Sequence, residues 1–488
     1  MTRVDHIFVL MLENRSFDHF FGLSGQPSIP TPTQDGYGPG ATDIAAGDPP
    51  HEFKDVQTQI ACGTMAGFEA AAKLAFEPAQ IPVITQLAQE FVLFDNWFSS
   101  VPGPTWPNRF FVHAASSGGL ATSPTNAQEK GAVFSTTSPF NFQNGSIFDR
   151  LSDRKYAKEW RVYHGDIHPQ VLAMPGMVTQ YLTRHDRFCP TFPGDPNFSD
   201  FATDVSDRDY APAYTFIEPN YAIQLDSLFK YGDSQHPLGR VSAGEALIKY
   251  IYEALRNSPL WSSSVLLITW DEHGGFYDHV TPKGATPPGD ASLNKPTDGS
   301  DPGFGFDSLG VRVPALLVSP LVPRGALGSQ LFANQFFDHS SVIKSVFENF
   351  DLGAPLTARD GAAPSWNGCL DASARAGVGD GPPRLSSPAA PSTSALAPVP
   401  QPAGNKHVDG FTTGMAVIAH QLDLQLARRT GRPPVANVKP QTPTEYRRAR
   451  RASLKDPNFK LQVVQYIKEV SVRVHAHRIR NAALAKRS

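Results

Sequence analysis

The sequence predicts an α/β domain on a mostly parallel central sheet flanked by helices, followed by a helical C-terminal tail. Short runs that are apolar at every position alternate with longer segments of helical periodicity, a pattern typical of parallel strands buried on both faces. The 488 residues include 39 Gly and 44 Pro, which indicates long loops between these elements. Hydrophobic residues make up 40% of the chain, enough for a sizeable core.

The predicted elements follow one another along the chain. Four segments have the length and continuous hydrophobicity of buried strands: residues 6–12, 91–94, 264–270 and 311–318. Residues 82–90 and 241–257 have helical periodicity, and each segment comes directly before one of these strands. Pro259 stops the second helix.

Composition divides the chain into three parts. Residues 1–373 carry all the predicted strands and are expected to form one domain. Residues 374–404 are rich in Pro, Ala, Ser and Gly and are interpreted as a flexible linker. Residues 405–488 contain two helical patterns, at 412–429 and 456–484, and form the predicted tail.

Charge differs between the tail and the rest of the chain. Residues 405–488 contain 17 Lys and Arg against 5 Asp and Glu, whereas the preceding residues contain 26 against 41. The net charge is only -3, which argues against a protein that coats nucleic acid, and no nucleic-acid partner is expected. The tail is therefore basic and the body acidic.

The N-terminus and the cysteines give expectations about compartment. No secretory signal is recognised, and no apolar run is long enough to span a bilayer. A cytoplasmic location is the default expectation, and an extracellular or periplasmic one applies if the chain is a processed form. Cys62, Cys189 and Cys369 are odd in number and widely spaced, so neither a disulfide framework nor a zinc motif is predicted.

Two of the predicted buried strands end in pairs of polar residues, Glu13-Asn14 and Asp271-Glu272. Ligands of open parallel sheets bind beyond the carboxyl ends of the strands. If the two strands are neighbours, three carboxylates and an amide oxygen meet at one edge, and a cation is needed to offset their charge. Capping of the next helix or turn explains either pair alone equally well. Together the two pairs predict one divalent metal ion, whose identity stays open.

A third segment, PGPTWPNRFFVHA at residues 102–114, adds a hydroxyl group. Pro107 suits the first turn of a helix, so Thr105 is expected just before a helix N-terminus. Backbone N–H groups and the helix dipole favour an anion there, and metal coordination would make the hydroxyl a nucleophile. The alternative is an N-cap or loop threonine, which is the better interpretation if the carboxylates are ignored.

Six motifs give the chain a family resemblance. They are LENRSFDHFFG from residue 12, DPPH from 48, PGPTWPNR from 102, FIEPNY from 216, DSQHP from 233 and TWDEHGGFYDHV from 269. In sequence, order and spacing these motifs resemble the bacterial phosphoesterase family of phosphocholine-type phospholipases C and related acid phosphatases, over about residues 4–350. The resemblance implies an alkaline-phosphatase-like fold, a single catalytic metal and a Ser or Thr nucleophile that is transiently phosphorylated. It makes residues 1–373 the catalytic phosphoesterase domain.

The resemblance also assigns individual residues. Five of them match the metal ligands: Glu13, Asn14, Thr105, Asp271 and Glu272. Thr105 also matches the nucleophile, and Asn108 matches a donor to the phosphoryl oxygens. Three resemble the pocket histidines of the family: His51, His164 and His236. Neutral His donates to phosphate oxygens, and His⁺ protonates a leaving alkoxide.

The remaining histidines have plainer expectations. His273 and His279 lie inside the TWDEHGGFYDHV motif and are expected to support the metal ligands from behind. His19, His113, His475 and His477 are expected to be surface or packing residues.

The predicted function is that of a metal-dependent, phospholipase C-like hydrolase of phosphoric esters that forms a phospho-enzyme on Thr105. The alternative is an acid phosphatase acting on phosphomonoesters. A non-catalytic binding protein on the same fold is less favoured, because the hydroxyl at Thr105 and the ligand carboxylates are present. The expected partner is a phosphate-ester substrate, with phospholipid as one candidate. Choline recognition would require an aromatic cage, for which there are four candidates: Trp106, Trp160, Tyr163 and Tyr221.

The basic tail leaves two alternatives open. Four arginines, Arg447, Arg448, Arg450 and Arg451, form a cluster that would attract an anionic membrane surface. The other alternative is that the tail folds back on the acidic body.

Overall fold

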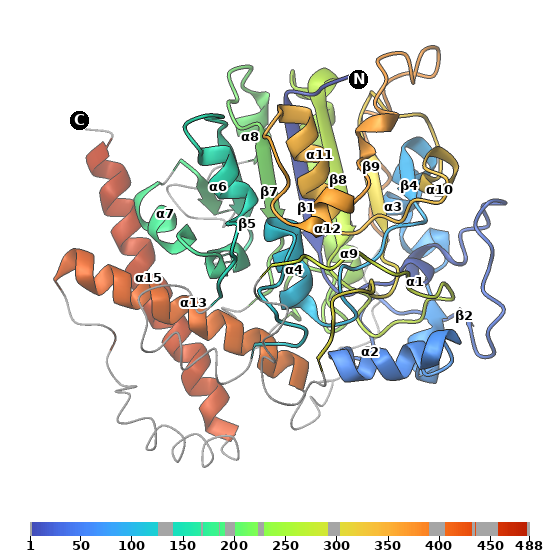
Figure 1. Ribbon diagram of the computed structural model, residues 1–488, viewed down its shortest axis with the longest axis horizontal. Coiled ribbons are helices and arrows are strands. Elements are labelled where there is room, and N and C mark those ends of the chain that lie inside the picture. The colour runs from blue at the N-terminus through green and yellow to red at the C-terminus, as the bar shows by residue number, and fades with distance from the viewer. Residues whose placement is uncertain are drawn as a thin grey trace.

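A seven-stranded sheet with helices on both faces forms the centre of the protein, and a helical tail packs beside it (Figure 1). The computed structural model describes residues 2–124, 140–166, 169–184, 186–190, 201–222, 229–290, 303–389, 406–431, 435 and 457–485. A separate pair of two-residue strands, β2 (Gly38–Pro39) and β3 (Leu74–Ala75), lies outside the main sheet.

The main sheet is mostly parallel. In spatial order its strands are β4 (Val92–Phe94), β9 (Ala315–Val318), β8 (Ser264–Trp270), β1 (His6–Leu12), β7 (Tyr214–Glu218), β5 (Trp160–His164) and β6 (Phe188–Pro190). Among the strands that the structure describes, β9 alone runs against its neighbours, and it pairs antiparallel with both β4 and β8. The predicted α/β class with a mostly parallel sheet is confirmed.

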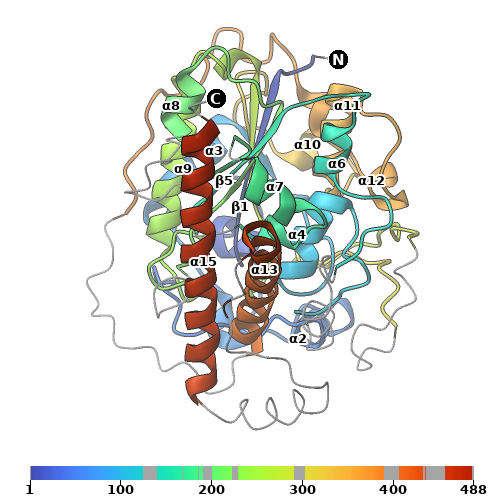
Figure 2. The same cartoon turned by 90° about the vertical axis from the view of Figure 1, so that its left-hand side faces the viewer.

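Helices cover both faces of the sheet, which explains why its central strands are apolar at almost every position. One face carries α3 (Pro82–Glu90), α8 (Phe201–Ser206) and α9 (Val241–Arg256). The other face carries α4 (Thr105–Ala114), α6 (Ile147–Ser152), α11 (Ser340–Phe350) and α12 (Ala358–Ala362), as Figure 2 shows edge-on. Side chains of β1 and β8 are buried almost without exception, so these two strands form the middle of the core.

Short helices fill the loops around this centre. The α-helices among them are α1 (Phe17–Phe21), α2 (Phe53–Ile60), α7 (Met177–Thr183) and α10 (Gly328–Leu331). The one-turn 3₁₀ helices are η1 (Ala61–Gly63), η2 (Ala70–Lys73), η3 (Pro78–Gln80), η4 (Gln170–Ala173), η5 (Trp261–Ser263) and η7 (Trp366–Cys369).

One predicted strand differs from the structure. Residues 311–318 were expected to form a single buried parallel strand, whereas β9 covers only Ala315–Val318 and runs antiparallel. Pro314 has no N–H group to donate to a ladder, so the strand begins after it. Before it, the Val313 N–H donates to the Trp97 carbonyl, and Arg312 forms a bridge with Phe98, so this part of the segment pairs elsewhere.

The first half of the predicted linker is hydrogen-bonded to the domain. Residues 381–385 accept hydrogen bonds from long polar side chains of α9. Tyr252 donates its hydroxyl to the Pro382 carbonyl at 2.7 Å, and Lys249 Nζ donates to the Leu385 carbonyl at 2.6 Å. Carbonyls of a Pro- and Gly-rich segment have no helix or sheet partner and are available as acceptors. The rest of the predicted linker, residues 390–404, lies outside the described residues.

The tail consists of two long helices, α13 (Lys406–Thr430) and α15 (Pro457–Ala485), which pack against each other and against α7 (Figure 2). Arg478 donates to the Phe188 carbonyl at 2.7 Å, and its guanidinium lies 3.9 Å from the centre of the Tyr181 ring. The described part of the tail is thus folded back on the body. The arginine cluster at residues 447–451 lies outside the described residues, and no helix among those described is long and apolar enough to cross a membrane.

Candidate active site

Two neighbouring strands bring the predicted metal ligands to one edge of the sheet. β1 and β8 are parallel, with Leu12 opposite Trp270, so the polar pairs that follow them lie side by side. All four side chains, Glu13, Asn14, Asp271 and Glu272, are fully buried. The Asn14 N–H donates to Asp271 Oδ1 at 3.0 Å, which ties the two pairs together.

The turn at this edge depends on two unusual backbone positions. Asn14 has a φ of 60°, a left-handed conformation that Asn adopts more readily than most residues. Gly274 has a φ of 65°, and a Cβ there would lie 2.3 Å from the Asn14 carbonyl oxygen. Any larger residue at 274 would push this turn away, so the close approach requires glycine.

Thr105 reaches the same edge from α4. The helix begins at Thr105 itself, so the expected position just before the helix is off by one residue, and Pro107 lies at the third position. Thr105 Oγ1 donates to Asn14 Oδ1 over 3.4 Å, a long hydrogen bond. The hydroxyl therefore lies at a helix N-terminus and beside a predicted metal ligand, where an anion is favoured.

The Asn108 side chain is hydrogen-bonded to the backbone of the loop before α4. Its Nδ2 group donates to the carbonyls of Gly103 at 2.9 Å and Pro104 at 3.0 Å, and its Oδ1 accepts from the Val101 N–H at 3.0 Å. In this geometry the amide hydrogens point at backbone oxygens. The arrangement favours a role in holding the turn before Thr105 over the predicted role as a donor to phosphoryl oxygens.

Arg109 is a site residue that the sequence analysis did not single out. Its Nε donates to Asp271 Oδ2 at 3.0 Å, and its Nη2 donates to the Met11 and Leu12 carbonyls at 3.3 and 3.2 Å. The signal was available, because Arg109 belongs to the PGPTWPNR motif and lies one helical turn after Thr105.

His51 and His236 both lie close to Asp48, a second site residue that the sequence did not single out. His51 Nδ1 is 2.7 Å from the Pro49 carbonyl and must donate to it, so in the neutral ring Nε2 accepts from Asn14 Nδ2, which is 3.1 Å away. Asp48 Oδ1 lies 4.0 Å from His51 Nδ1 and 3.7 Å from His236 Nε2. Asp48 belongs to the same DPPH motif as His51, which was its sequence signal.

His164 is placed differently from the other two pocket histidines. It is buried at the end of β5, two strands away from β1, and its Nδ1 lies 2.6 Å from the Asp166 carbonyl. It therefore shares the edge of the sheet with the carboxylates but belongs to its other half.

The carboxylates at this edge carry more negative charge than the protein around them offsets. Neither carboxylate oxygen of Glu13 accepts a hydrogen bond of normal geometry, nor does Glu272 Oε1. Burial raises the pKa of Glu13 well above its usual range, against the opposing effect of the Arg109 guanidinium. Burial likewise raises the pKa of Glu272 to about 8, with His51 opposing it. Buried acidic oxygens without donors fit a divalent cation with oxygen ligands.

A second acidic group is already neutralised. Among the His, Cys, Asp and Glu side chains described, those of Asp18, Asp278 and His279 bring their ligand atoms within 4.8 Å of one another. Arg312 donates to both Asp18 and Asp278, at 2.8 and 3.1 Å, and His279 Nδ1 lies 2.7 Å from Asp18. Because Arg312 and His279 already occupy these carboxylates, this group fits a cation less well than the edge of β1 and β8 does.

The remaining histidines either contact carboxylates or pack among apolar side chains. His273 lies 3.2 Å from Glu272 Oε2, so it supports a predicted ligand from behind as expected, whereas His279 pairs with Asp18 instead. His19 stacks on Phe276 with ring centres 3.8 Å apart. Burial lowers the pKa of His113 to about 3. His19 and His113 are thus packing residues, as predicted.

All four aromatic cage candidates are buried in the hydrophobic core. The Trp160 ring centre lies 4.8 Å from that of Phe148, and the Tyr163 ring centre lies 5.1 Å from that of Phe201. Trp106 directly follows Thr105, and the Arg109 guanidinium lies 5.4 Å from the centre of the Tyr221 ring.

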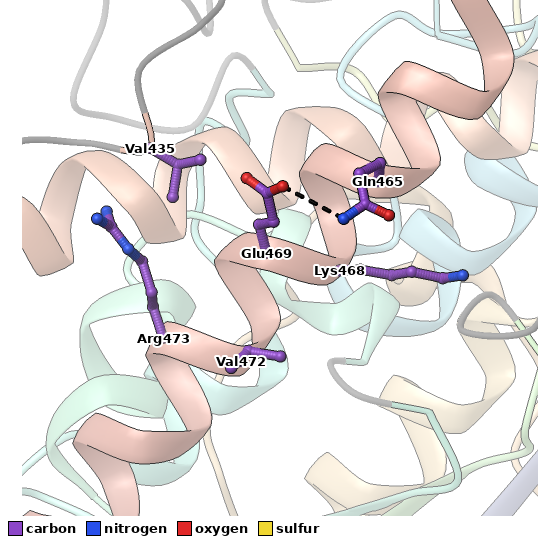
Figure 3. A pocket seen from close by; sticks show the side chains of 6 residues that line it. All are labelled: Val435, Gln465, Lys468, Glu469, Val472 and Arg473. Atoms are coloured by element: carbon purple, nitrogen blue, oxygen red, sulfur yellow. Dashed lines mark hydrogen bonds between the residues drawn. The ribbon is translucent and has the colours of Figure 1, made fainter. Parts of the chain in front are cut away.

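An open hollow of about 320 Å³ lies on the tail (Figure 3). It is lined by Val435, Gln465, Lys468, Glu469, Val472 and Arg473. Its charges are mixed, and within this lining Gln465 donates to Glu469 at 3.2 Å. The hollow has neither the nucleophile nor the grouped carboxylates found at the edge of β1 and β8, so we do not assign it to the active site.

Comparison with known proteins identifies the family of the chain. The Phosphoesterase family model matches residues 4–353. Non-specific phospholipase C6 of Arabidopsis thaliana is 32% identical, over 74% of this chain and 71% of its own length. Phospholipase C B of Mycobacterium tuberculosis is 28% identical, over 73% of this chain and 75% of its own length.

A solved structure from Vibrio parahaemolyticus, described as a protein in the alkaline phosphatase superfamily, is similar at 11% identity with a TM-score of 0.33, over 75% of this chain and 71% of that one. This likeness is too distant to add to the argument. The family model covers most of the chain, from residue 4 to residue 353. The chain therefore belongs to the Phosphoesterase family and is a hydrolase of phosphoric esters.

Proposed function

We propose that the protein is a metal-dependent phosphoric ester hydrolase of the phospholipase C type, with Thr105 as its nucleophile. One observation carries the proposal. The Thr105 hydroxyl lies at the N-terminus of α4, 3.4 Å from Asn14 Oδ1, at an edge where buried carboxylate oxygens of Glu13 and Glu272 lack hydrogen bonds. A hydroxyl, an anion-favouring helix end and a cation-favouring group of oxygens are the parts that phosphoryl transfer requires.

The residues that would hold the metal supply only oxygen atoms: Glu13, Asn14, Thr105, Asp271 and Glu272. Oxygen ligation suits hard or borderline divalent cations. When bound, such a cation would stabilise charge on the phosphoryl oxygens and lower the pKa of a coordinated hydroxyl.

The protein residues provide the remaining chemistry. Thr105 Oγ1 attacks phosphorus and releases its proton to solvent, a Thr105–phosphorus bond forms, and the bond from phosphorus to the leaving oxygen breaks. The leaving alkoxide takes up a proton from the protonated form of His51 or His236, which leaves that histidine neutral. Water then attacks phosphorus and gives one proton to the same histidine, the bond to Thr105 breaks, and Thr105 Oγ1 takes up a proton from solvent, which regenerates the hydroxyl. The backbone N–H groups at the start of α4 face the phosphoryl group throughout.

The substrate class follows from the relatives. Relatives named as phospholipases C in a plant and in a bacterium support a phosphodiester, with phospholipid as the leading substrate. In that case the alkoxide leaves on the diacylglycerol side, and the head group stays on phosphorus until the second step. A phosphomonoester is the runner-up substrate.

The test is an assay of the full chain with a phosphomonoester, a soluble phosphocholine diester and phosphatidylcholine, each with chelator and with added divalent metal. The proposal predicts metal-dependent cleavage of phosphatidylcholine that releases phosphocholine. Cleavage of the monoester alone would favour the acid phosphatase. Full activity toward any of these substrates in protein shown to be free of metal would contradict the proposal.

A further inference from the structure

Arg109 is a buried cation that bonds directly to a predicted metal ligand, Asp271. It projects from α4 and forms a salt bridge with Asp271 at 3.0 Å, while its Nη2 group donates to the carbonyls that end β1. The residue is only 2% exposed. One side chain thus joins the helix of the nucleophile to the strand ends that carry both ligand pairs.

The hydrogen bonds at this edge are distributed unevenly. Asp271 accepts three hydrogen bonds, since Oδ1 accepts from the N–H groups of Asn14 and Glu272 at 3.0 and 2.7 Å and Oδ2 accepts from Arg109, which leaves one acceptor site on Oδ2. Neither oxygen of Glu13 accepts a hydrogen bond of normal geometry, and Arg109 Nη1 donates to none. Glu272 accepts from the Gly274 N–H at 2.7 Å and lies 3.7 Å from His51, so Arg109 provides the positive charge next to Asp271 and not next to every carboxylate of the cluster.

We propose that Arg109 is a positioning residue that serves as the resident counter-cation of this site, holding Asp271 and the start of α4 in place when no metal is bound. A buried carboxylate that loses its cationic partner is strongly destabilised unless another cation replaces it. The inference rests on the proposed function in one respect, namely that a metal binds beside these carboxylates and can substitute for part of the charge of Arg109.

The geometry calls for arginine rather than lysine. The planar guanidinium reaches a carboxylate and two carbonyls at once and lies 5.4 Å from the centre of the Tyr221 ring. A lysine keeps the charge but cannot make this set of contacts. Arg109→Lys should therefore preserve charge compensation while loosening the link between α4 and the strands.

Arg359 provides a matched control. It is 3% exposed, pairs with Asp338 at 2.8 Å, donates to the carbonyls of Ser100 and Phe306, and lies 5.1 Å from the Phe111 ring. Its surroundings resemble those of Arg109, but no predicted metal ligand is among its partners. A purely structural arginine should behave like Arg359.

The experiment measures the Tm of the full chain for wild type, Arg109→Met, Arg109→Lys and Arg359→Met. Each protein is measured with a chelator and with excess Ca²⁺, Mg²⁺, Mn²⁺ or Zn²⁺. We expect Arg109→Met to lower the Tm in chelator by roughly 5 °C or more. Metal should recover at least half of that loss, a larger rise than in wild type, and Arg109→Lys should change less in the same direction. Arg359→Met should lose stability equally with and without metal.

Equal losses for Arg109→Met with and without metal would overturn the inference. If metal fails to raise the Tm of wild type, it is the proposed function that fails, and the role of Arg109 is then decided in chelator alone. In an Asp271→Asn background, Arg109→Met should cost less than half of what it costs in wild type, because the charge to be compensated is gone. An unchanged cost would again overturn the inference.

Discussion

At the scale of single residues, the site is a group of buried oxygens without enough donors. Glu13 and Glu272 have carboxylate oxygens that accept no hydrogen bond, although both residues are fully buried. Most buried polar groups in proteins are paired, so unpaired ones indicate either a cost in stability or a ligand. The nearby Thr105 hydroxyl favours the ligand.

Metal content tests which acidic group binds. We expect about one metal ion per wild-type chain, and a clear loss in Glu13→Ala and Asp271→Ala, because these remove oxygens from the predicted ligand set. Asp278→Ala is the matched control, since Asp278 belongs to the acidic group already paired with Arg312. Elemental analysis of the purified variants makes the comparison. Loss of metal in Asp278→Ala with full retention in Asp271→Ala would place the metal at the group of Asp18, Asp278 and His279 instead.

The pH dependence of stability follows from Glu272. Burial raises its pKa from 4.5 to about 8, so between these values the folded state binds more protons than the unfolded state. Stability of the metal-free protein should therefore fall as pH rises from about 5 to about 8. Glu272→Gln removes this contribution, and the fall should become smaller.

Urea unfolding in chelator at several pH values measures this difference between wild type and variant. Comparing the two is essential, because burial also raises the pKa of Glu245 to about 7 and of Asp278 to about 6, and both slopes have the same sign. Identical pH slopes in wild type and Glu272→Gln would show that the charged form of Glu272 is not penalised by folding.

At the scale of elements, a glutamate from one helix caps another. The residue before α3 is Ile81, which has no side-chain acceptor. Glu245 of α9 is buried and accepts from the N–H groups of Val83 and Ile84 at 2.9 and 2.8 Å. It satisfies two of the N–H groups that the start of α3 leaves unpaired.

Loss of this cap should lower the free energy of unfolding and leave the catalytic turnover unchanged. Glu245→Ala should cost about 1–3 kcal/mol of unfolding free energy, because it leaves two buried N–H groups unpaired. Glu245→Gln keeps one acceptor oxygen and should cost less. Denaturant unfolding measures the cost, and turnover per folded molecule should stay at the wild-type value. A change in turnover with no change in stability would contradict the capping role.

The elements also show what local sequence can and cannot predict. Residues 6–12, 82–90 and 264–270 were predicted with both ends correct, because apolar runs and helical periodicity are local signals. Strand β9 was predicted too long at its N-terminal end, because Pro314 has no N–H group for the ladder and the strand begins after it. Segment 374–389 was taken as flexible because its partners lie on α9, far away in the sequence.

The site residues also divide into those that local sequence predicts and those that depend on contacts distant in the sequence. The two pairs of predicted metal ligands were singled out because each directly follows a predicted strand, and the structure places the two pairs side by side. Arg109 and Asp48 were missed although they lie in quoted motifs, because their roles appear only when α4 and the loop before His51 are placed against the strand ends. The pairing of β1 with β8 could only be assumed from the sequence.

At the scale of the whole molecule, the tail is part of the folded body. Among the described side chains of α13 and α15, the buried apolar ones are Met415, Ile418, Ala419, Leu422, Leu426, Ile467, Val470 and Val474. Helix α13 also packs against η4 and α4, so the tail touches the helix that carries Thr105. Recruitment to an anionic membrane through residues 447–451 stays a prediction, because these residues lie outside the described part of the chain.

Truncation after residue 404 tests the docking of the tail and keeps segment 374–389, which is hydrogen-bonded to the domain. We expect lower solubility and a lower Tm, because α7 and η4 lose their apolar cover and Tyr181 loses Arg478. Thermal unfolding and size-exclusion chromatography of both forms make the measurement. A truncated protein as stable and monodisperse as the full chain would show that the tail is an independent unit. In that case, weaker binding of the truncated form to anionic vesicles at low salt would support the membrane role.

The turnover of Thr105 variants with equal metal content decides whether Thr105 is the nucleophile. Thr105→Ala should lose several orders of magnitude of turnover, roughly a thousandfold or more, because no other hydroxyl is placed at the start of α4 to attack. Thr105→Ser should stay within about tenfold of wild type, since the chemistry needs only the hydroxyl. If Thr105→Ala with a full complement of metal keeps more than about a tenth of wild-type turnover, Thr105 is not the nucleophile and a water molecule attacks instead.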